Sequence, residues 1–294
     1  INFSEHHYSH AASAFYPSPF KEAVILTLDG VGEWATTTVS IGDKNKLEIV
    51  KEIHFPHSLG LLYSAFTYYT GFKVNSGEYK LMGLAPYGKP IFKDLIIDKL
   101  LDLKEDGSFK INMEYFSYAT GLTMTNKKFS KLFGNPVRNP NKDLLKEFHM
   151  NIAASIQAVT EEIVLRLTRS ISKEYNIKNL CLAGGVALNC VANGKILKEK
   201  VFEKIWIQPA AGDAGGSLGA ALAYWHHELK MPRNHYKDQM NGSYLGPKLE
   251  NNIIEDKLNN LKAIYKKLNL SEIISTTAKE LSKEKTVGWF QGRM

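Results

Sequence analysis

The feature that most constrains this chain is an alternation of apolar runs and glycine-rich turns in its second half. The segments "IKNLCLAGG" and "KIWIQPAAGD" have the composition of buried strands that end in turns. Each is followed by a helical segment, first "VALNCVANGKILKE" and then "AGGSLGAALAYWHHEL". Strand, helix, strand, helix with short turns is typical of parallel strands joined by crossover helices. The pattern predicts an α/β fold.

The first half adds a different kind of sheet. "EAVILTLDG" is a continuous apolar run that ends in Asp-Gly, and "ATTTVSI" and "KLEIVKEIHF" follow it with only turn residues between them. Three such runs in succession predict an antiparallel meander. Amphipathic stretches predict helices around it, the longest over 142–176 and another over 90–103. We therefore expect mixed sheets with flanking helices.

Composition limits the classes of partner. With 294 residues, 44% of them hydrophobic and 23% charged, the chain can bury a sizeable core as one large domain or two lobes. The net charge of +7 is spread along the sequence, which suits phosphate-bearing ligands but predicts no nucleic-acid partner. No apolar run is long enough to predict a membrane span. Two cysteines nine positions apart form no disulfide framework, so we expect a cytoplasmic protein.

Three histidines lie close together in "EHHYSHAASAF". The segment follows Ser4, a residue type that caps helices, and its alanines favour a helix. His6 and His10 would then share one face and could bind a transition metal with a carboxylate from elsewhere. The same residues are also consistent with a histidine-rich surface turn or with two hydrogen-bonded histidines. Both readings stay open at this point.

Carboxylates and glycines follow the predicted strands. Asp29 and Gly30 come after the first strand, and Gly184 and Gly185 form the turn in "LAGGVALN". Backbone N–H groups at a strand–helix turn favour an anion, although a tight turn alone also requires glycine. Asp213, in "AAGDAGGSLG", is either a helix N-cap or the missing carboxylate ligand. Ligands of α/β folds gather at the ends of strands, where both aspartates lie.

Six segments in a fixed order resemble a known family. They are "HHYSHAASAFYPSPF", "LDGVGEW", "GEYKLMGLAPYGKP", "LAGGVALNCVANGKI", "GDAGGSLGAAL" and "VGWFQGRM". The chain resembles the NodU/CmcH carbamoyltransferases, which O-carbamoylate small molecules such as antibiotics and lipo-oligosaccharides. The resemblance implies a two-lobed fold of the actin/sugar-kinase/heat-shock ATPase type, here truncated at its N-terminus.

The resemblance also implies a reaction. In this family a YrdC-like domain makes carbamoyl-adenylate from carbamoyl phosphate and ATP. The intermediate passes to a divalent metal site, where a hydroxyl of a small-molecule or saccharide acceptor attacks the carbamoyl carbon. The expected cofactors are therefore ATP or carbamoyl-adenylate and a metal, with iron(II) and zinc both compatible with histidine and carboxylate ligands.

The family's ligand positions fall on four residues of this chain. His6 and His10 match its HxxxH pair, Asp213 matches its later aspartate, and Asp29 matches an additional carboxylate near the metal. His7, three residues before His10, is an alternative ligand. These assignments are implied by the resemblance.

The resemblance also assigns catalytic and nucleotide-binding positions. The expected catalytic residues are Asp29, His10 and Lys80, the last in "GEYKLMG". Asp29 would orient a histidine ligand or act as base, and Lys80 would meet phosphate or the carbamoyl group. The expected nucleotide-binding residues are Gly30, Gly184, Gly185, Val186, Asn189 and Gly212.

The expected domain organisation has four parts. Residues 1–142 would form an incomplete first lobe with the histidine helix, and 143–230 a nucleotide-binding second lobe. Residues 231–270 would be a linker, and 271–294 the start of a truncated YrdC-like domain with a helix followed by a strand in "TVGWFQ". This chain would therefore lack the activating step.

Two other functions fit the same residues, namely tRNA threonylcarbamoyl transfer on this fold and a non-catalytic nucleotide-binding module. The identity of the acceptor is not predicted, and a homo-oligomer stays open.

Overall fold

A computed structural model describes residues 1–294, and they form two compact units, Ile1–Gln239 and Met240–Met294. The main sheet comprises β1 (Glu22–Leu28), β2 (Ala35–Asp43), β3 (Lys46–His54), β6 (Asn179–Ala183) and β7 (Lys204–Ile207). The helices of the first unit are α1 (His6–Phe15), α2 (Leu59–Tyr69), α3 (Glu78–Leu84), α4 (Lys93–Leu100), α5 (Lys127–Phe133), α6 (Glu147–Tyr175), α7 (Cys190–Glu199) and α8 (Asp213–Ala223). A small hairpin joins β4 (Leu101–Leu103) to β5 (Phe109–Ile111), and the second unit contains α9 (Asn251–Asn260) and α10 (Leu270–Leu281).

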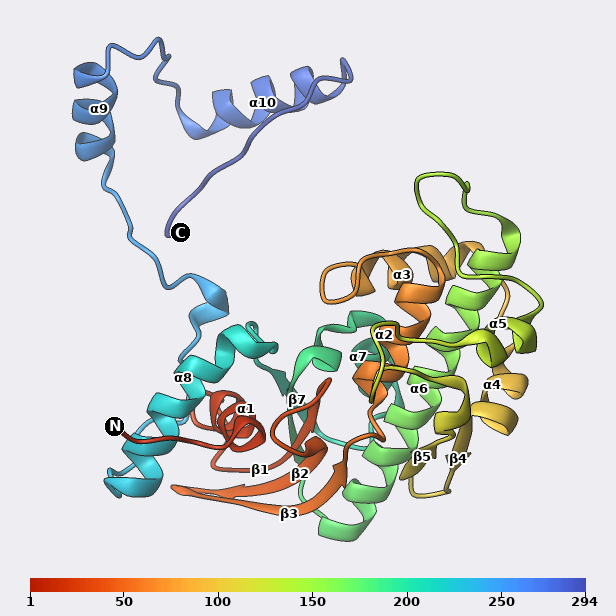
Figure 1. The fold of residues 1–294 in the computed structure, drawn as a ribbon. Coiled ribbons are helices and arrows are strands. Elements are labelled where there is room, and N and C mark those ends of the chain that lie inside the picture. Colours follow the sequence, from red (N-terminus) through yellow and green to blue (C-terminus); the bar gives the residue numbers. More distant parts are fainter. The chain divides into compact units, whose positions relative to one another are not determined.

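The five main strands form one mixed sheet in the order β3-β2-β1-β6-β7 (Figure 1). The pairs β1–β2 and β2–β3 are antiparallel, while β1–β6 and β6–β7 are parallel. Leu26 is opposite Val39 on one side and Leu182 on the other. The predicted α/β class, the meander and the parallel crossovers are confirmed.

The direct pairing of β1 with β6 joins strands of the two predicted lobes in one sheet. The predicted first lobe supplies β1, β2 and β3, and the predicted second lobe supplies β6 and β7, yet all five belong to one sheet. A boundary between residues 142 and 143 therefore does not separate two sheets, because β1 hydrogen-bonds with both groups of strands. The two compact units divide after Gln239.

Alternating side chains give the sheet two buried faces. Val24 and Leu26 belong to the larger core, which includes residues of α2 and α6. Ala23 and Ile25 point the other way, into a smaller core built around α1 and reaching Ala223 of α8. Successive residues of a strand point to opposite faces, so a strand that is buried on both faces is apolar throughout. Figure 1 shows α1 and α8 side by side next to β1.

Three predicted elements differ from the structure. The helix predicted over 90–103 ends at Leu100, because Leu101 is extended (φ −133°, ψ 144°) and begins β4. The strand expected in "TVGWFQ" does not form, and the side chains of Trp289 and Phe290 are 52% and 72% exposed. The predicted linker 231–270 contains α9. No helix in the chain combines the length and the apolar character needed to cross a bilayer.

Candidate functional site

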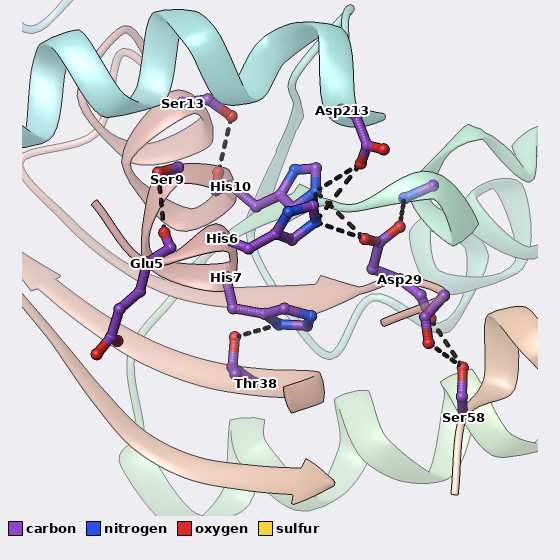
Figure 2. A network of polar contacts seen from close by, with 12 residues as sticks. Glu5, His6, His7, Ser9, His10, Ser13, Asp29, Thr38, Ser58 and Asp213 are labelled. Carbon is purple, nitrogen blue, oxygen red and sulfur yellow. Dashed lines mark hydrogen bonds and ion pairs between the residues drawn. The ribbon is translucent and has the colours of Figure 1, made fainter. Parts of the chain in front are cut away.

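The site is built around α1 and the residue that follows β1. The helix begins at His6 with Glu5 as its N-cap, one position later than a Ser4 cap predicts, and Ser4 instead accepts a hydrogen bond from the Ser9 hydroxyl. One turn apart, His6 and His10 point toward Asp29 and Asp213 (Figure 2). Asp29 directly follows β1, and Asp213 is the first residue of α8. The predicted pairing of the two histidines with both aspartates is present in the structure.

Four donor atoms of these residues converge within 4.8 Å of one another. His6 Nε2 lies 2.9 Å from Asp29 Oδ2 and 3.1 Å from His10 Nε2. Asp213 Oδ1 lies 3.5 Å from both histidine nitrogens. Ligand atoms about 2.1 Å from a common metal are separated by roughly 3.0–3.4 Å in octahedral and tetrahedral geometry. The observed separations fit one cation between the four atoms.

Asp29 is the most constrained member of the group. Its Oδ1 accepts a hydrogen bond of 2.9 Å from the backbone N–H of Gly185, while Oδ2 faces both histidines. Burial opposes ionisation of this carboxyl, but the hydrogen bonds with His10, His6 and Gly185 outweigh it and hold its pKa far below the usual range. The hydrogen bond with Asp29 raises the pKa of His6 despite partial burial. Asp29 and His6 therefore form a hydrogen-bonded pair.

His7 has a different environment from its neighbours. Its Nδ1 lies 3.3 Å from the hydroxyl of Thr38, on β2 (Figure 2), and its ring centre lies 5.8 Å from that of His6. Burial lowers the pKa of His7 to about 4. The cluster of converging donor atoms does not include it, so the geometry favours His6 over the alternative ligand His7.

A cavity of about 650 Å³ adjoins the group and includes Asp29 and Asp213 in its lining. Most of the residues expected to bind nucleotide also line it, namely Gly30, Gly185, Val186, Asn189 and Gly212. They come from the ends of β1 and β6 and from the start of α8, so a shared edge of the sheet gathers them.

Besides the two histidines, two predicted site residues, Gly184 and Lys80, lie outside the lining. Gly184 has φ +86°, and a Cβ there would lie 2.2 Å from the backbone oxygen of Leu28. Gly184 therefore lets the end of β6 approach the end of β1 closely. Lys80 is exposed, and its Nζ lies 5.9 Å from the ring centre of Tyr79, whose side chain does line the cavity.

Asn189 lines the cavity, but its amide is engaged within the protein. Its Oδ1 accepts hydrogen bonds from the backbone N–H of Ala192 and from Gln157 Nε2, and its Nδ2 donates to Gln157 Oε1. The Tyr63 hydroxyl also donates to Gln157, at 3.0 Å. These contacts cap α7 and connect it with α6 and α2 beneath the cavity.

One wall of the cavity was missed by sequence reasoning. It consists of residues of α2, α3 and the loop between them, including Ser64, Asn75, Ser76, Glu78 and Tyr79. The Glu78 carboxylate accepts hydrogen bonds from the hydroxyl of Ser64 (2.8 Å) and the backbone N–H of Asn75 (2.9 Å). The segment "GEYKLMG" was expected to contribute to the site through Lys80. In the structure its neighbours Glu78 and Tyr79 line the cavity instead.

Comparison with known proteins identifies relatives of the whole chain. Residues 1–222 match the family model described as carbamoyltransferase N-terminus. An uncharacterized protein of Synechocystis is 62% identical over 99% of this chain and 48% of its own length. Nodulation protein NolNO of Sinorhizobium fredii is 34% identical over 100% of this chain and 41% of its own, and NolO of Bradyrhizobium diazoefficiens is 33% identical over 98% and 50%. The chain spans half or less of the length of these relatives.

A crystal structure of full-length HypF, in a phosphate- and nucleotide-bound form, aligns with 74% of this chain and 42% of its own. The TM-score is 0.39 and the identity 14%, a likeness too weak to support a conclusion. The match of residues 1–222 to the carbamoyltransferase N-terminus model, together with the sequence relatives, shows that this chain belongs to that carbamoyltransferase family.

Proposed function

We propose that this chain carries the transfer site of a metal-dependent O-carbamoyltransferase. The carbamoyl group would pass from carbamoyl-adenylate, made from carbamoyl phosphate and ATP, to a hydroxyl of a small molecule or saccharide. The observation that carries the proposal is the convergence of His6, His10, Asp29 and Asp213 at the edge of a cavity. Family membership supports the same reaction class.

The donor set fits a divalent transition metal. Two imidazole nitrogens and two carboxylate oxygens form the mixed set typical of iron(II) and zinc sites, and their separations suit one ion. His10 is fully buried, while Asp213 is 80% exposed at its side chain, so the site has a closed side and an open side. A metal held here would polarise the carbamoyl carbonyl and stabilise charge on the leaving phosphate.

Asp29 has the contacts of an orienting carboxylate. One oxygen is held by the Gly185 N–H, and the other faces the two histidine nitrogens. Such partners fix the tautomer and ring orientation of a ligating histidine. Both oxygens are therefore engaged, which favours orientation of the histidines over proton abstraction from the acceptor.

The two ends of the cavity suit different parts of the reactants. Val186 and Gly212 lie at the starts of helical turns, where backbone N–H groups favour phosphate oxygens. At the other end, Ser76 and Tyr79 offer a hydroxyl and a 64% exposed aromatic side chain. We assign the nucleotide to the glycine end and the acceptor to the wall formed by α2 and α3.

Metal content tests the proposal directly. The chain would be purified without an affinity metal, reconstituted anaerobically with iron(II) or zinc, and analysed for bound metal. We expect about one ion per wild-type chain and almost none after combined replacement of His6, His10 and Asp213 by alanine. His54→Ala is the matched control, because His54 is exposed and pairs with Glu52 away from the site.

Transfer from synthetic carbamoyl-adenylate to a panel of hydroxyl compounds would then be measured in the same proteins. Loss of transfer in the triple variant and its retention in His54→Ala support the proposal. Negligible metal in the reconstituted wild-type chain, or transfer that survives loss of the metal, would contradict it.

A further inference from the structure

We infer that Gly219 and Gln208 are positioning residues that hold α8 against α1, so that Asp213 reaches the two histidines. Neither residue lines the cavity or contributes a donor atom to the converging group. The inference rests on the metal site proposed above and concerns how the fold builds it.

The backbones of α1 and α8 meet at Gly219. A Cβ on this residue would lie 1.8 Å from the backbone oxygen of Ser9, 2.6 Å from its carbonyl carbon and 3.1 Å from Ser13 Cβ. An ordinary contact of a Cβ atom is at least 3.4 Å. The obstructing atoms belong mainly to the α1 backbone and cannot rotate away as a side-chain tip can. Any side chain at position 219 therefore has to separate the two helices by more than about 1 Å.

The separation of these helices decides the geometry of the ligands. His6 and His10 belong to α1, and Asp213 begins α8 six residues before Gly219, about 9 Å along the helix axis. Asp213 Oδ1 is 3.5 Å from both histidine nitrogens at the present separation. Metal ligands have to be held within roughly 0.5 Å of their working positions. A displacement of more than 1 Å at the crossing is large on that scale.

Gln208 makes a second connection between α1 and the segment that leads to α8. It is fully buried, its Nε2 donates to the backbone oxygen of Ser13, and its Oε1 accepts from the backbone N–H of Ala210. The Ser13 oxygen is available because the residue four positions later is Pro17, which has no N–H to donate. Gln208 thus satisfies a helix-end carbonyl of α1 and fixes the loop that leads to Asp213.

Cobalt(II) alone is a suitable probe, because its visible absorption reports both affinity and ligand number. We expect Gly219→Ala in the 294-residue chain to bind cobalt about 10- to 100-fold more weakly than wild type, the range seen when the support of metal ligands is removed. Gly216→Ala is the matched control on the same helix, because a Cβ there meets nothing within 4 Å. It should bind cobalt as wild type does.

A cycle with Asp213→Ala separates positioning from general damage. If Gly219 acts through Asp213, adding Gly219→Ala to Asp213→Ala should change cobalt affinity by less than about threefold, a coupling expected of residues that act as a unit. Gln208→Leu provides a second variant, should Gly219→Ala fail to fold by circular dichroism, and it should also weaken cobalt binding.

Unchanged affinity in the folded variants, or an equally large effect in the Asp213→Ala background, overturns the inference. Absence of cobalt binding by wild type would overturn the metal site and this inference together, whereas binding by wild type with unchanged variants overturns this inference alone.

Discussion

At the scale of single residues, Asp29 connects parts of the chain that are far apart in sequence. Its side chain contacts His6 and the N–H of Gly185, and its backbone oxygen accepts a hydrogen bond from the Ser58 hydroxyl at 3.1 Å. The sequence shows only an aspartate at the end of an apolar run. The family resemblance placed Asp29 near His6, but its contacts with Gly185 and Ser58 could not be predicted, because they depend on how β1 is placed beside β6 and α2.

Gly184 supports the same junction, and its replacement tests the packing of the site. Its backbone conformation (φ 86°, ψ 162°) is essentially restricted to glycine, and a Cβ would lie 2.2 Å from the Leu28 oxygen. We expect Gly184→Ala to lower the free energy of unfolding by about 3 kcal/mol or more. Urea unfolding would measure the change.

Gly194→Ala is the control for that measurement. Gly194 lies within α7, and a Cβ there meets nothing within 4 Å, so alanine should be neutral or stabilising by up to about 1 kcal/mol. Equal stability of Gly184→Ala and wild type would show that the junction tolerates a side chain.

At the scale of elements, the strong hydrophobic patterns predicted the helices and strands, and the ends of elements were less predictable. The long helix α6 begins at Glu147. The backbone N–H of Lys146 donates to His149 Nδ1 at 3.0 Å, so a side chain in the first turn satisfies a donor that the helix leaves free. A histidine in this role is not a common start signal, which explains why the boundary was missed.

The contact at His149 predicts a dependence of stability on pH. Burial and the nearby charges of Arg138 and Lys146 lower the pKa of His149 below its usual value of 6.5, and protonation would remove the Nδ1 acceptor. As pH falls through 6.5 the unfolded chain binds more protons than the folded one, so this residue's contribution to stability is lost. Glutamine at this position keeps an acceptor and does not titrate.

We therefore expect the free energy of unfolding to decrease less between pH 7.5 and pH 5 in His149→Gln than in wild type. Urea titrations at several pH values would measure both slopes, and the other histidines contribute equally to each protein. Identical slopes would contradict the role assigned to His149.

At the scale of the whole molecule, the first unit contains nearly all of the buried apolar side chains. Residues 240–294 contribute one buried hydrophobic residue, Met240, whereas Ile1–Gln239 contains both faces of the sheet and the candidate metal site. A unit that contains its own core is expected to fold alone.

Truncation after Gln239 tests that expectation. The 1–239 fragment should unfold within about 1 kcal/mol of the full chain, since removal of exposed residues has small effects. It should also bind metal with the same stoichiometry. A loss of more than about 2 kcal/mol would show that the second unit stabilises the first.

The sequence by itself determined the α/β class, the meander, the parallel crossovers and the i, i+4 histidine pair, because these follow from local periodicity and from turn residues. The six ordered motifs also determined the family, which the comparisons confirmed. Only the tertiary structure decided that β1 and β6 share one sheet, that Asp29 accepts from Gly185, and that Gly219 lets α8 approach α1. These contacts join residues more than 150 positions apart, and their distances depend on packing that local patterns do not encode.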